Sequence, residues 1–336
     1  MKKGICVAGN LIVDITYPIE KWPNQGELVT ITEGITRSVG GAVCNDIVDL
    51  AKLDPTMPLT ALGVIGTDAE GDFILEELGK CKNIDLSNLK REGITSFTSV
   101  MSNNDTKART FFHYRGTNAR FDESYIDWEK LDCDIFHIGY ILLLDALDAE
   151  DPEYGTKMAR LLANAQKKGL KTSIDVVSES GNRFKKIVSP ALRYTDYCVI
   201  NEIEAQQITG VKLRDEDEKL YPENMEEALR AIKALGVSTW AVIHCPEGSW
   251  GLDEKDEFFF SPSLKVPKDD IKGTVGAGDA FCSGVIYGAW KGWTLAESVR
   301  LATCSAVAAL SERGATEGLR EIAEVMKFEE KYGYRS

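Results

Sequence analysis

Residues 271–288 read IKGTVGAGDAFCSGVIYG and place three glycines and an alanine ahead of one aspartate, where a helix is predicted to begin. Gly276, Ala277 and Gly278 are small, so their backbone N–H groups can face one concavity at the helix N-terminus, which suits a phosphate. Asp279 lies beside that concavity and could accept the proton of a substrate hydroxyl during phosphoryl transfer. The alternative is that Asp279 only caps the helix and that the glycines serve turn geometry.

Two familiar phosphate-binding motifs are excluded by the residues that follow this loop. A Walker A loop ends in G-K-[ST], whereas Asp279 and Ala280 follow the last glycine here. A dinucleotide fingerprint needs a further glycine at the position of Phe281. The loop therefore belongs neither to a P-loop NTPase nor to a Rossmann dehydrogenase.

Composition and charge narrow the class of partner. The 336 residues are 43% hydrophobic and 27% charged, which is typical of a globular protein in water. The formal net charge of −14 argues against a nucleic-acid or anionic-membrane surface. The N-terminal apolar run is interrupted by Gly9, Asn10 and Asp14, and no stretch approaches the length of a membrane span. Eight scattered cysteines without a C-x-x-C pair indicate free thiols, and we predict a cytoplasmic protein.

Short apolar runs alternate with amphipathic segments through most of the chain. We predict strands within residues 4–15, 59–66, 133–144, 171–177, 197–201 and 239–245, and helices at 70–81, 153–168, 223–235 and 294–311. Strands that are apolar on both faces and are followed by helices indicate a parallel sheet covered by helices. Ligands of such sheets bind at the carboxyl ends of the strands.

Two stretches break this rhythm, residues 15–38 and 94–121. Both alternate polar and apolar residues, as half-exposed antiparallel strands do, and side by side they would form a small projecting sheet, or lid. The alternative is that they are edge strands of the main sheet. With residues 15–38 and 94–121 as the lid, the main domain comprises residues 1–14, 39–93 and 122–336. Because a small sheet cannot bury both faces alone, we expect that two copies pair through their lids as a homodimer.

GTVGAGDAF resembles the C-terminal signature of the ribokinase-like (PfkB) carbohydrate kinases, whose usual form is D-T-x-G-A-G-D. Five more elements resemble family motifs and occur in the family's order: GNLIVD (9–14), VGGAVCNDIVDLAKL (39–53), GVIGTDAEGD (63–72), NEIEA (201–205) and GSWG (248–251). Six elements in order across nearly the whole chain are a specific signal. The resemblance implies a ribokinase-like three-layer α/β/α fold with a mainly parallel central sheet plus a small β-sheet lid.

The resemblance also implies a role for each matching residue. Asp279 would be the catalytic base and Gly276, Ala277 and Gly278 the anion hole; Asp14, Gly40, Gly41 and Asn45 would bind the acceptor; Asn201, Gly248 and Gly251 would bind the nucleotide; and Glu204 would reach Mg²⁺ through water. The residues alone allow plainer interpretations. Gly40 and Gly41 would also suit a turn before a helix, and Asn201 with Glu204 would also suit a helix cap.

The second lid stretch adds three candidates. We favour a substrate contact for Asn118 and leave Arg109 and Arg115 open between substrate contact and an exposed sheet surface. His113, His137 and His244 have no metal-ligand spacing, and His137 is predicted to be a buried strand residue.

Two positions depart from the family pattern. Gly273 stands where the signature usually has an aspartate that helps hold a monovalent cation, so we predict weak or no potassium dependence. Pro246 replaces a threonine that is often found two residues before Gly248, so the nucleotide loop is expected to differ locally.

The leading hypothesis is an ATP- and Mg²⁺-dependent kinase that phosphorylates a primary hydroxyl of a monosaccharide. The first rival is a nucleoside kinase of the same family, because lid aromatics (Tyr17, Trp22, Phe97 and Phe112) could stack a base. The second rival is a non-catalytic sugar- or nucleotide-binding protein. The presence of Asp279 argues against this rival, because a binding protein does not need a catalytic base.

Overall fold

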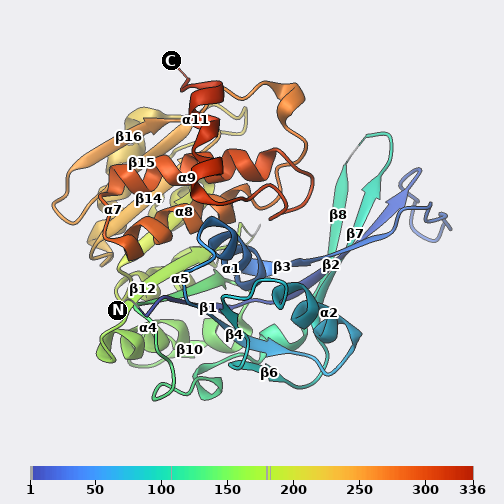
Figure 1. Cartoon of the computed structure of the whole chain (residues 1–336), viewed down its shortest axis with the longest axis horizontal. Helices are drawn as coiled ribbons and strands as arrows, with labels where there is room; N and C mark the ends of the chain where they lie inside the picture. The colour runs from blue at the N-terminus through green and yellow to red at the C-terminus, as the bar shows by residue number, and fades with distance from the viewer. Residues whose placement is uncertain (1–2, 107, 179–180, 182, 336) are drawn as a thin grey trace.

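The central sheet runs through the body of the protein, here in a computed structural model that describes residues 3–106, 108–178, 181 and 183–335 (Figure 1). Its strand order is β16-β15-β14-β13-β12-β9-β1-β4-β5, and β6 pairs with β4 outside this path. Neighbours are parallel except at β14–β15 and β15–β16, so the predicted mainly parallel sheet is confirmed. The bounds are β1 (Ile5–Gly9), β4 (Leu59–Ile65), β5 (Ile84–Asp85), β6 (Leu89–Arg91), β9 (Ile135–Ile141), β12 (Lys171–Val176), β13 (Tyr197–Asn201), β14 (Trp240–Cys245), β15 (Gly248–Leu252) and β16 (Phe258–Pro262).

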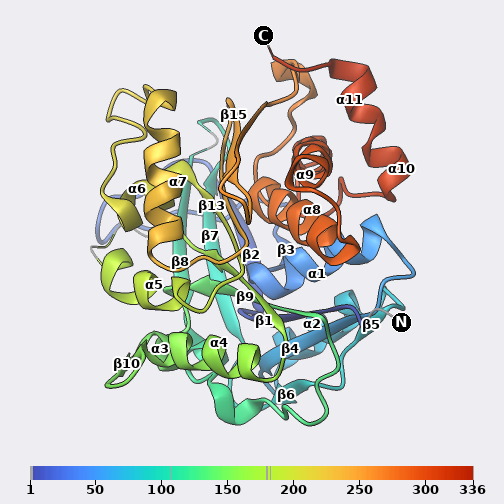
Figure 2. The same cartoon turned by 90° about the vertical axis from the view of Figure 1, so that its left-hand side faces the viewer.

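Helices cover both faces of this sheet (Figure 2). One core joins the sheet to α1 (Gly41–Leu53), α2 (Ala69–Leu78), α8 (Ala277–Lys291) and α9 (Leu295–Leu310). The other core joins it to α4 (Lys157–Lys167), α5 (Phe184–Leu192), α6 (Glu202–Thr209) and α7 (Met225–Ala234). Short elements complete the body: α3 (Asp145–Asp148), β10 (Glu150–Asp151), β11 (Gly155–Thr156), α10 (Ile322–Val325) and α11 (Lys327–Tyr332). The result is the predicted three-layer arrangement.

Glycines inside α8 let it lie close against α9. A Cβ at Gly284 would lie 2.4 Å from the Cα of Ala302, and a Cβ at Gly288 would lie 2.1 Å from Oγ of Ser298. Both distances are shorter than real contacts, and a close-packed interior has no room to relax them. Close packing against α9 therefore sets where the N-terminus of α8 points.

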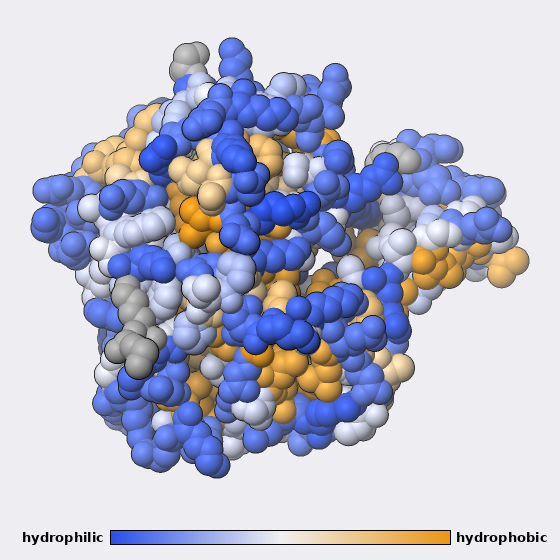
Figure 3. Space-filling model, in the orientation of Figure 1, coloured by the Kyte–Doolittle hydropathy of each residue, from blue (hydrophilic) through white to orange (hydrophobic). Residues whose placement is uncertain are grey.

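A separate four-stranded sheet projects from the body, with strand order β3-β2-β7-β8 (Figure 1). It consists of β2 (Ile12–Ile19), β3 (Thr36–Gly40), β7 (Ser96–Asn103) and β8 (Arg109–Tyr114). The start of β2 and the end of β3 extend a few residues into the ranges assigned above to the main domain. Apolar side chains gather on this lid sheet (Figure 3). The interpretation as edge strands of the main sheet is wrong, and so is a purely antiparallel lid, because β2 and β7 are parallel. Parallel neighbours need a long crossover, which α1, β4 and α2 supply here.

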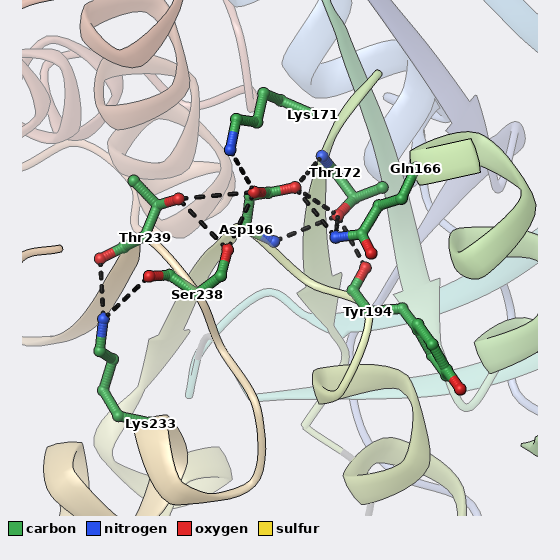
Figure 4. Close-up of polar contacts among 8 residues, drawn as sticks. All are labelled: Gln166, Lys171, Thr172, Tyr194, Asp196, Lys233, Ser238 and Thr239. Carbon is green, nitrogen blue, oxygen red and sulfur yellow. Dashed lines mark hydrogen bonds and ion pairs between the residues drawn. The ribbon is translucent and has the colours of Figure 1, made fainter. Parts of the chain in front are cut away.

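A buried carboxylate ties three strands together at the edge of the sheet opposite the carboxyl ends (Figure 4). Asp196 precedes β13 and accepts hydrogen bonds from Lys171 Nζ at 2.6 Å, Thr172 N at 2.9 Å, Ser238 Oγ at 2.9 Å and Gln166 Nε2 at 3.1 Å. Burial favours the protonated form of Asp196, but these donors outweigh burial and hold its pKa below the usual value. The network aligns the starts of β12, β13 and β14.

Two further expectations concern the whole chain. All eight cysteines are free and six of them are buried, so the predicted free thiols are confirmed and a disulfide framework is not formed. Within the part of the chain that the structure describes, no helix is both long and apolar enough to span a bilayer.

Candidate active site

The N-terminus of α8 has the geometry of an anion site. Gly276 is its N-cap residue with φ of 77°, a left-handed conformation that favours glycine, and a Cβ there would lie 2.4 Å from the carbonyl oxygen of Ala315. Ala277, Gly278 and Asp279 form the first turn, where backbone N–H groups have no partner within the helix. These N–H groups and the positive end of the helix dipole favour an anion at this point.

Asp279 faces residues from two other segments of the chain. Asn45 in α1 donates from Nδ2 to Oδ2 of Asp279 at 2.9 Å, and the hydroxyl of Tyr140 in β9 donates to Oδ1 at 2.5 Å. The carboxylate is buried and bonds to these side chains, and the N-cap position of α8 has no side-chain cap. The arrangement therefore favours a chemical role for Asp279 over helix capping.

More carboxylates surround this group. Asp46 in α1 and Asp175 in β12 each place an oxygen so near Asp279 that all three oxygens lie within 4.8 Å of one another. Asp46 also contacts Nε2 of His137 at 3.1 Å, and burial lowers the pKa of His137 to about 4. Burial raises the pKa of Asp279, while the hydrogen bonds from Tyr140 and Asn45 lower it. Burial first, and then the neighbouring carboxylates, raise the pKa values of Asp46 and Asp175.

The predicted acceptor residues Asp14, Gly40 and Gly41 lie together where β3 meets α1. A Cβ at Gly40 would lie 2.4 Å from Oδ2 of Asp14, so only glycine leaves the carboxylate in place. Gly41 has φ of 82° and starts α1, the helix that carries Asn45 one turn later. Burial raises the pKa of Asp14, and a hydrogen bond with Thr98 partly opposes that rise. The glycine pair thus does more than form a turn.

Asn118 does not lie open to a ligand. Its side chain is fully buried, with Oδ1 accepting from the N–H of Leu11 at 3.2 Å and Nδ2 donating to the carbonyl of Leu11 at 3.1 Å. This arrangement holds the link between β1 and β2, and it favours a structural role over the substrate contact predicted from the sequence. The sequence could not separate the two roles, because both use the ability of an amide side chain to donate and accept hydrogen bonds.

The two arginines of the lid lie in different surroundings. Arg109 is exposed at the outer end of β8, far along the strand from the body. Arg115 donates from Nη1 to the carbonyl of Leu142 at 2.9 Å and pairs with Asp145 at 3.3 Å, at the carboxyl end of β9. Arg115 therefore joins lid and body, and Arg109 belongs to the exposed sheet surface.

A cavity of about 500 Å³ opens on the other side of the α8 N-terminus. Its lining includes Asn201, Pro246, Gly248, Gly278, Thr303 and Val307. Gly251 is not part of this lining: it is buried in β15, where a Cβ would lie 2.8 Å from Cδ2 of Leu295 in α9. The predicted nucleotide contact of Gly251 is replaced by close packing, while Asn201 and Gly248 do face the cavity.

Asn201 and Glu204 form a capping box at the start of α6. Asn201 Oδ1 accepts from the N–H of Glu204 at 2.9 Å, and Glu204 Oε2 accepts from the N–H of Asn201 at 3.0 Å. The other oxygen of Glu204 accepts from Ser178 Oγ at 2.8 Å, and burial raises the pKa of Glu204 to about 7. Each oxygen of Glu204 thus accepts one hydrogen bond that fixes the carboxylate at the start of α6, and its contact with Mg²⁺ through water remains a prediction.

Several residues of the site have no signal in the sequence. Tyr140 lies in an apolar strand pattern, and Asp46 follows Asn45 as an ordinary polar residue of an amphipathic helix. Thr303, Ala306, Val307 and Leu310 of α9 line the cavity but read as core. Only the sheet order brings these residues together.

The N-terminus of α8 lies beside the buried Asp279 and a cavity at the carboxyl edge of the parallel sheet, and a separate lid sheet projects from the same body, an arrangement that fits a phosphotransferase. The chain matches the model of the pfkB family carbohydrate kinases over residues 2–322 and belongs to that family.

Known relatives agree with this assignment. A ribokinase of Arabidopsis thaliana is 25% identical over 326 residues, which are 96% of this chain and 80% of that protein. The structure of Arabidopsis thaliana ribokinase complexed with ribose and ATP superposes with a TM-score of 0.78 at 21% identity, covering 98% of this chain and 99% of the other. A nucleoside kinase of Methanocaldococcus jannaschii has a TM-score of 0.70 at 20% identity, covering 98% and 99% of the two chains.

Proposed function

We propose that this carbohydrate kinase transfers the γ-phosphate of ATP to a primary hydroxyl of a monosaccharide, with Asp279 as general base. One observation carries the proposal: Asp279 and Gly278 are consecutive, yet the first faces the acceptor residue Asn45 and the second lines the large cavity. A phosphoryl group passing between cavity and acceptor must therefore cross the N-terminus of α8.

In this mechanism the residues of the chain hold the proton and the developing charge. Asp279 accepts the proton of the acceptor hydroxyl as its oxygen attacks the γ-phosphorus and the bond to the β-phosphate oxygen breaks. The N–H groups of residues 276–278 stabilise the charge on the moving phosphoryl group. Mg²⁺ bound with ATP would neutralise phosphate charge, and Glu204 is proposed to reach it through water.

The lid sheet supports a polyhydroxylated acceptor. Asp14 pairs in register with Ser38 on β3 and Thr98 on β7, and Thr98 pairs with His113 on β8, so four polar side chains cross one face of the lid. Nδ1 of His113 lies 3.1 Å from Oγ1 of Thr98. Such a row of donors and acceptors suits several sugar hydroxyls.

The same register weighs against base stacking by three of the four lid aromatics named above. Tyr17, Phe97 and Phe112 occupy the alternate positions of their strands, so they lie on the face opposite Asp14. A nucleoside acceptor stays the rival because a nucleoside kinase shares this fold. The similarity to Arabidopsis thaliana ribokinase, whose structure is complexed with ribose and ATP, supports a sugar as the acceptor.

We further propose a cytoplasmic homodimer that pairs through the lid. Phe112 and Tyr114 lie on the same face of β8 and are exposed, with 58% of Phe112 accessible, and a second lid would cover such apolar side chains. Light scattering after size-exclusion chromatography tests this: a dimer that becomes monomeric on Phe112→Ser and Tyr114→Ser supports lid pairing. A monomeric wild-type protein contradicts it.

ADP release from ATP and Mg²⁺ tests the proposed activity across a panel of monosaccharides and nucleosides. We expect turnover with a sugar, and Asp279→Asn serves as the blank for ATP hydrolysis without an acceptor. Turnover only with nucleosides would favour the nucleoside kinase. Saturable sugar or ATP binding without ADP release from any acceptor would favour the non-catalytic binding protein.

A further inference from the structure

Tyr140 lies against the proposed base although no family motif includes it. Its hydroxyl is 2.5 Å from Oδ1 of Asp279, while Asn45 occupies Oδ2 of the same carboxylate at 2.9 Å. Both oxygens therefore accept a hydrogen bond from a neutral side chain, and the plane of the carboxylate is fixed. The acceptor hydroxyl must approach through the lone pairs that these two donors leave.

Hydrogen bonds with Asn10 hold the backbone at Tyr140 in place. Oδ1 of Asn10 accepts from the N–H of Tyr140, and the N–H of Asn10 donates to the carbonyl of Gly139 at 2.9 Å. Asn10 links β1 to β2 and is fully buried. The end of β9 is thus anchored to the strand that leads to Asp14, which fixes Tyr140 relative to both the base and the acceptor residues.

The charges around Asp279 explain what a neutral donor would accomplish there. The titratable groups that face it are Asp46 and Asp49 of α1, His137 and Tyr140 of β9, Asp175 of β12 and Cys282 of α8. Burial raises the pKa of Asp279 and so favours its protonated form, and a protonated carboxyl cannot act as a base. Hydrogen bonds from Tyr140 and Asn45 favour the ionised form.

We propose that Tyr140 is a positioning residue that keeps Asp279 ionised and aimed at the acceptor hydroxyl. This inference rests on the proposed phosphoryl transfer. Tyr140 keeps its own proton throughout and only donates a hydrogen bond, while the proton of the acceptor goes to Asp279. Burial, followed by the nearby carboxylates, raises the pKa of Tyr140 well above its ordinary value, which agrees with a hydroxyl that stays protonated.

Tyr140→Phe tests the proposal because it removes only the hydroxyl. We expect kcat to fall roughly tenfold or more, KM for ATP to stay the same, and the acidic limb of the kcat profile to move to higher pH. Tyr287→Phe is the matched control, since its hydroxyl donates to Asp54 at 2.9 Å, away from the site. A Tyr140→Phe enzyme with wild-type kcat and pH profile would overturn the proposal.

A measurement without turnover separates this inference from the proposed function. NMR spectra are recorded on protein isotopically labelled at the tyrosine ring carbon that bears the hydroxyl. The chain contains 11 tyrosines, and the signal that is missing from the spectrum of Tyr140→Phe belongs to Tyr140. We expect Asp279→Asn to shift that signal and to leave the signal of Tyr287 unchanged. An unshifted signal overturns the Tyr140 contact, whereas silence of the wild type across the acceptor panel overturns the proposed function.

Discussion

Nδ2 of Asn45 lies 2.9 Å from Oδ2 of Asp279, so the N-terminal part of α1 meets the first turn of α8 across 234 residues of sequence. This contact joins the acceptor region to the proposed base. The other amide atom of Asn45, Oδ1, is buried and has no hydrogen-bond partner among the described residues, which leaves it available for an acceptor hydroxyl.

Asn45→Ala should therefore lower both catalysis and acceptor affinity. We expect kcat to fall roughly tenfold or more, equivalent to about 1.4 kcal/mol of transition-state stabilisation, and KM for the acceptor to rise. KM for ATP should stay unchanged because Asn45 is not part of the lining of the 500 Å³ cavity, where we propose that ATP binds. Steady-state kinetics with each substrate varied in turn makes this test, and an effect confined to KM for ATP would contradict it.

Asp279→Asn should remove the base while preserving the shape of the site. We expect kcat to fall roughly 10²- to 10⁴-fold, the usual range for a positioned base. Calorimetric binding of ATP should be nearly retained. Asp269→Asn, at an exposed position, is the control, and near-normal turnover of Asp279→Asn would exclude it from the mechanism.

Gly40→Ala tests close approach at the acceptor site. The φ of Gly40 is −154°, an extended conformation open to any residue, so the only cost is the added Cβ at 2.4 Å from Oδ2 of Asp14. We expect Asp14 to be displaced and KM for the acceptor to rise at least tenfold, with ATP binding intact. An unchanged KM for the acceptor in Gly40→Ala would refute the contact.

Asp196 should make stability depend on pH. Its pKa is lowered in the folded protein, so its contribution is fully present above the pKa of the unfolded chain and is lost as pH falls through the lower folded value. Asp196→Ala leaves buried donors without a partner and should reduce the free energy of unfolding at pH 7 by about 3 kcal/mol. Denaturant titrations between pH 7 and pH 3 measure this, with exposed Asp217→Asn as control. Equal stabilities of wild type and Asp196→Ala at neutral pH would contradict the role.

Potassium should have little effect on the rate. A Cβ at Gly273 would lie 2.8 Å from the carbonyl oxygen of Glu312 and 3.0 Å from that of Arg313, so this backbone leaves no room for the aspartate of the usual signature. Turnover in potassium is compared with turnover in a bulky organic cation at equal ionic strength. A tenfold rise with potassium would show this prediction to be wrong.

The order of layers could be predicted from the sequence because it depends on local pattern. Strands such as Ile135–Ile141 and Tyr197–Asn201 are apolar on both faces, and the helices between them carry one apolar face, which already specifies a covered parallel sheet. The turn chemistry of Gly276–Asp279 likewise depends on neighbouring residues. These features follow from conformational preferences that act over a few residues.

The tertiary structure alone decided which side chains meet at the carboxyl edge of the central sheet. Tyr140 and Asn45 reach Asp279 because β9 lies next to β1 and α1 packs on α8, and neither neighbour relation is encoded in a local period. The same holds for Asn118, for which its place in the second lid stretch predicted a substrate contact, whereas in the folded chain its side chain bonds to the backbone of Leu11. Contacts across more than a hundred residues depend on strand order and burial, so they exist only once the whole core has formed.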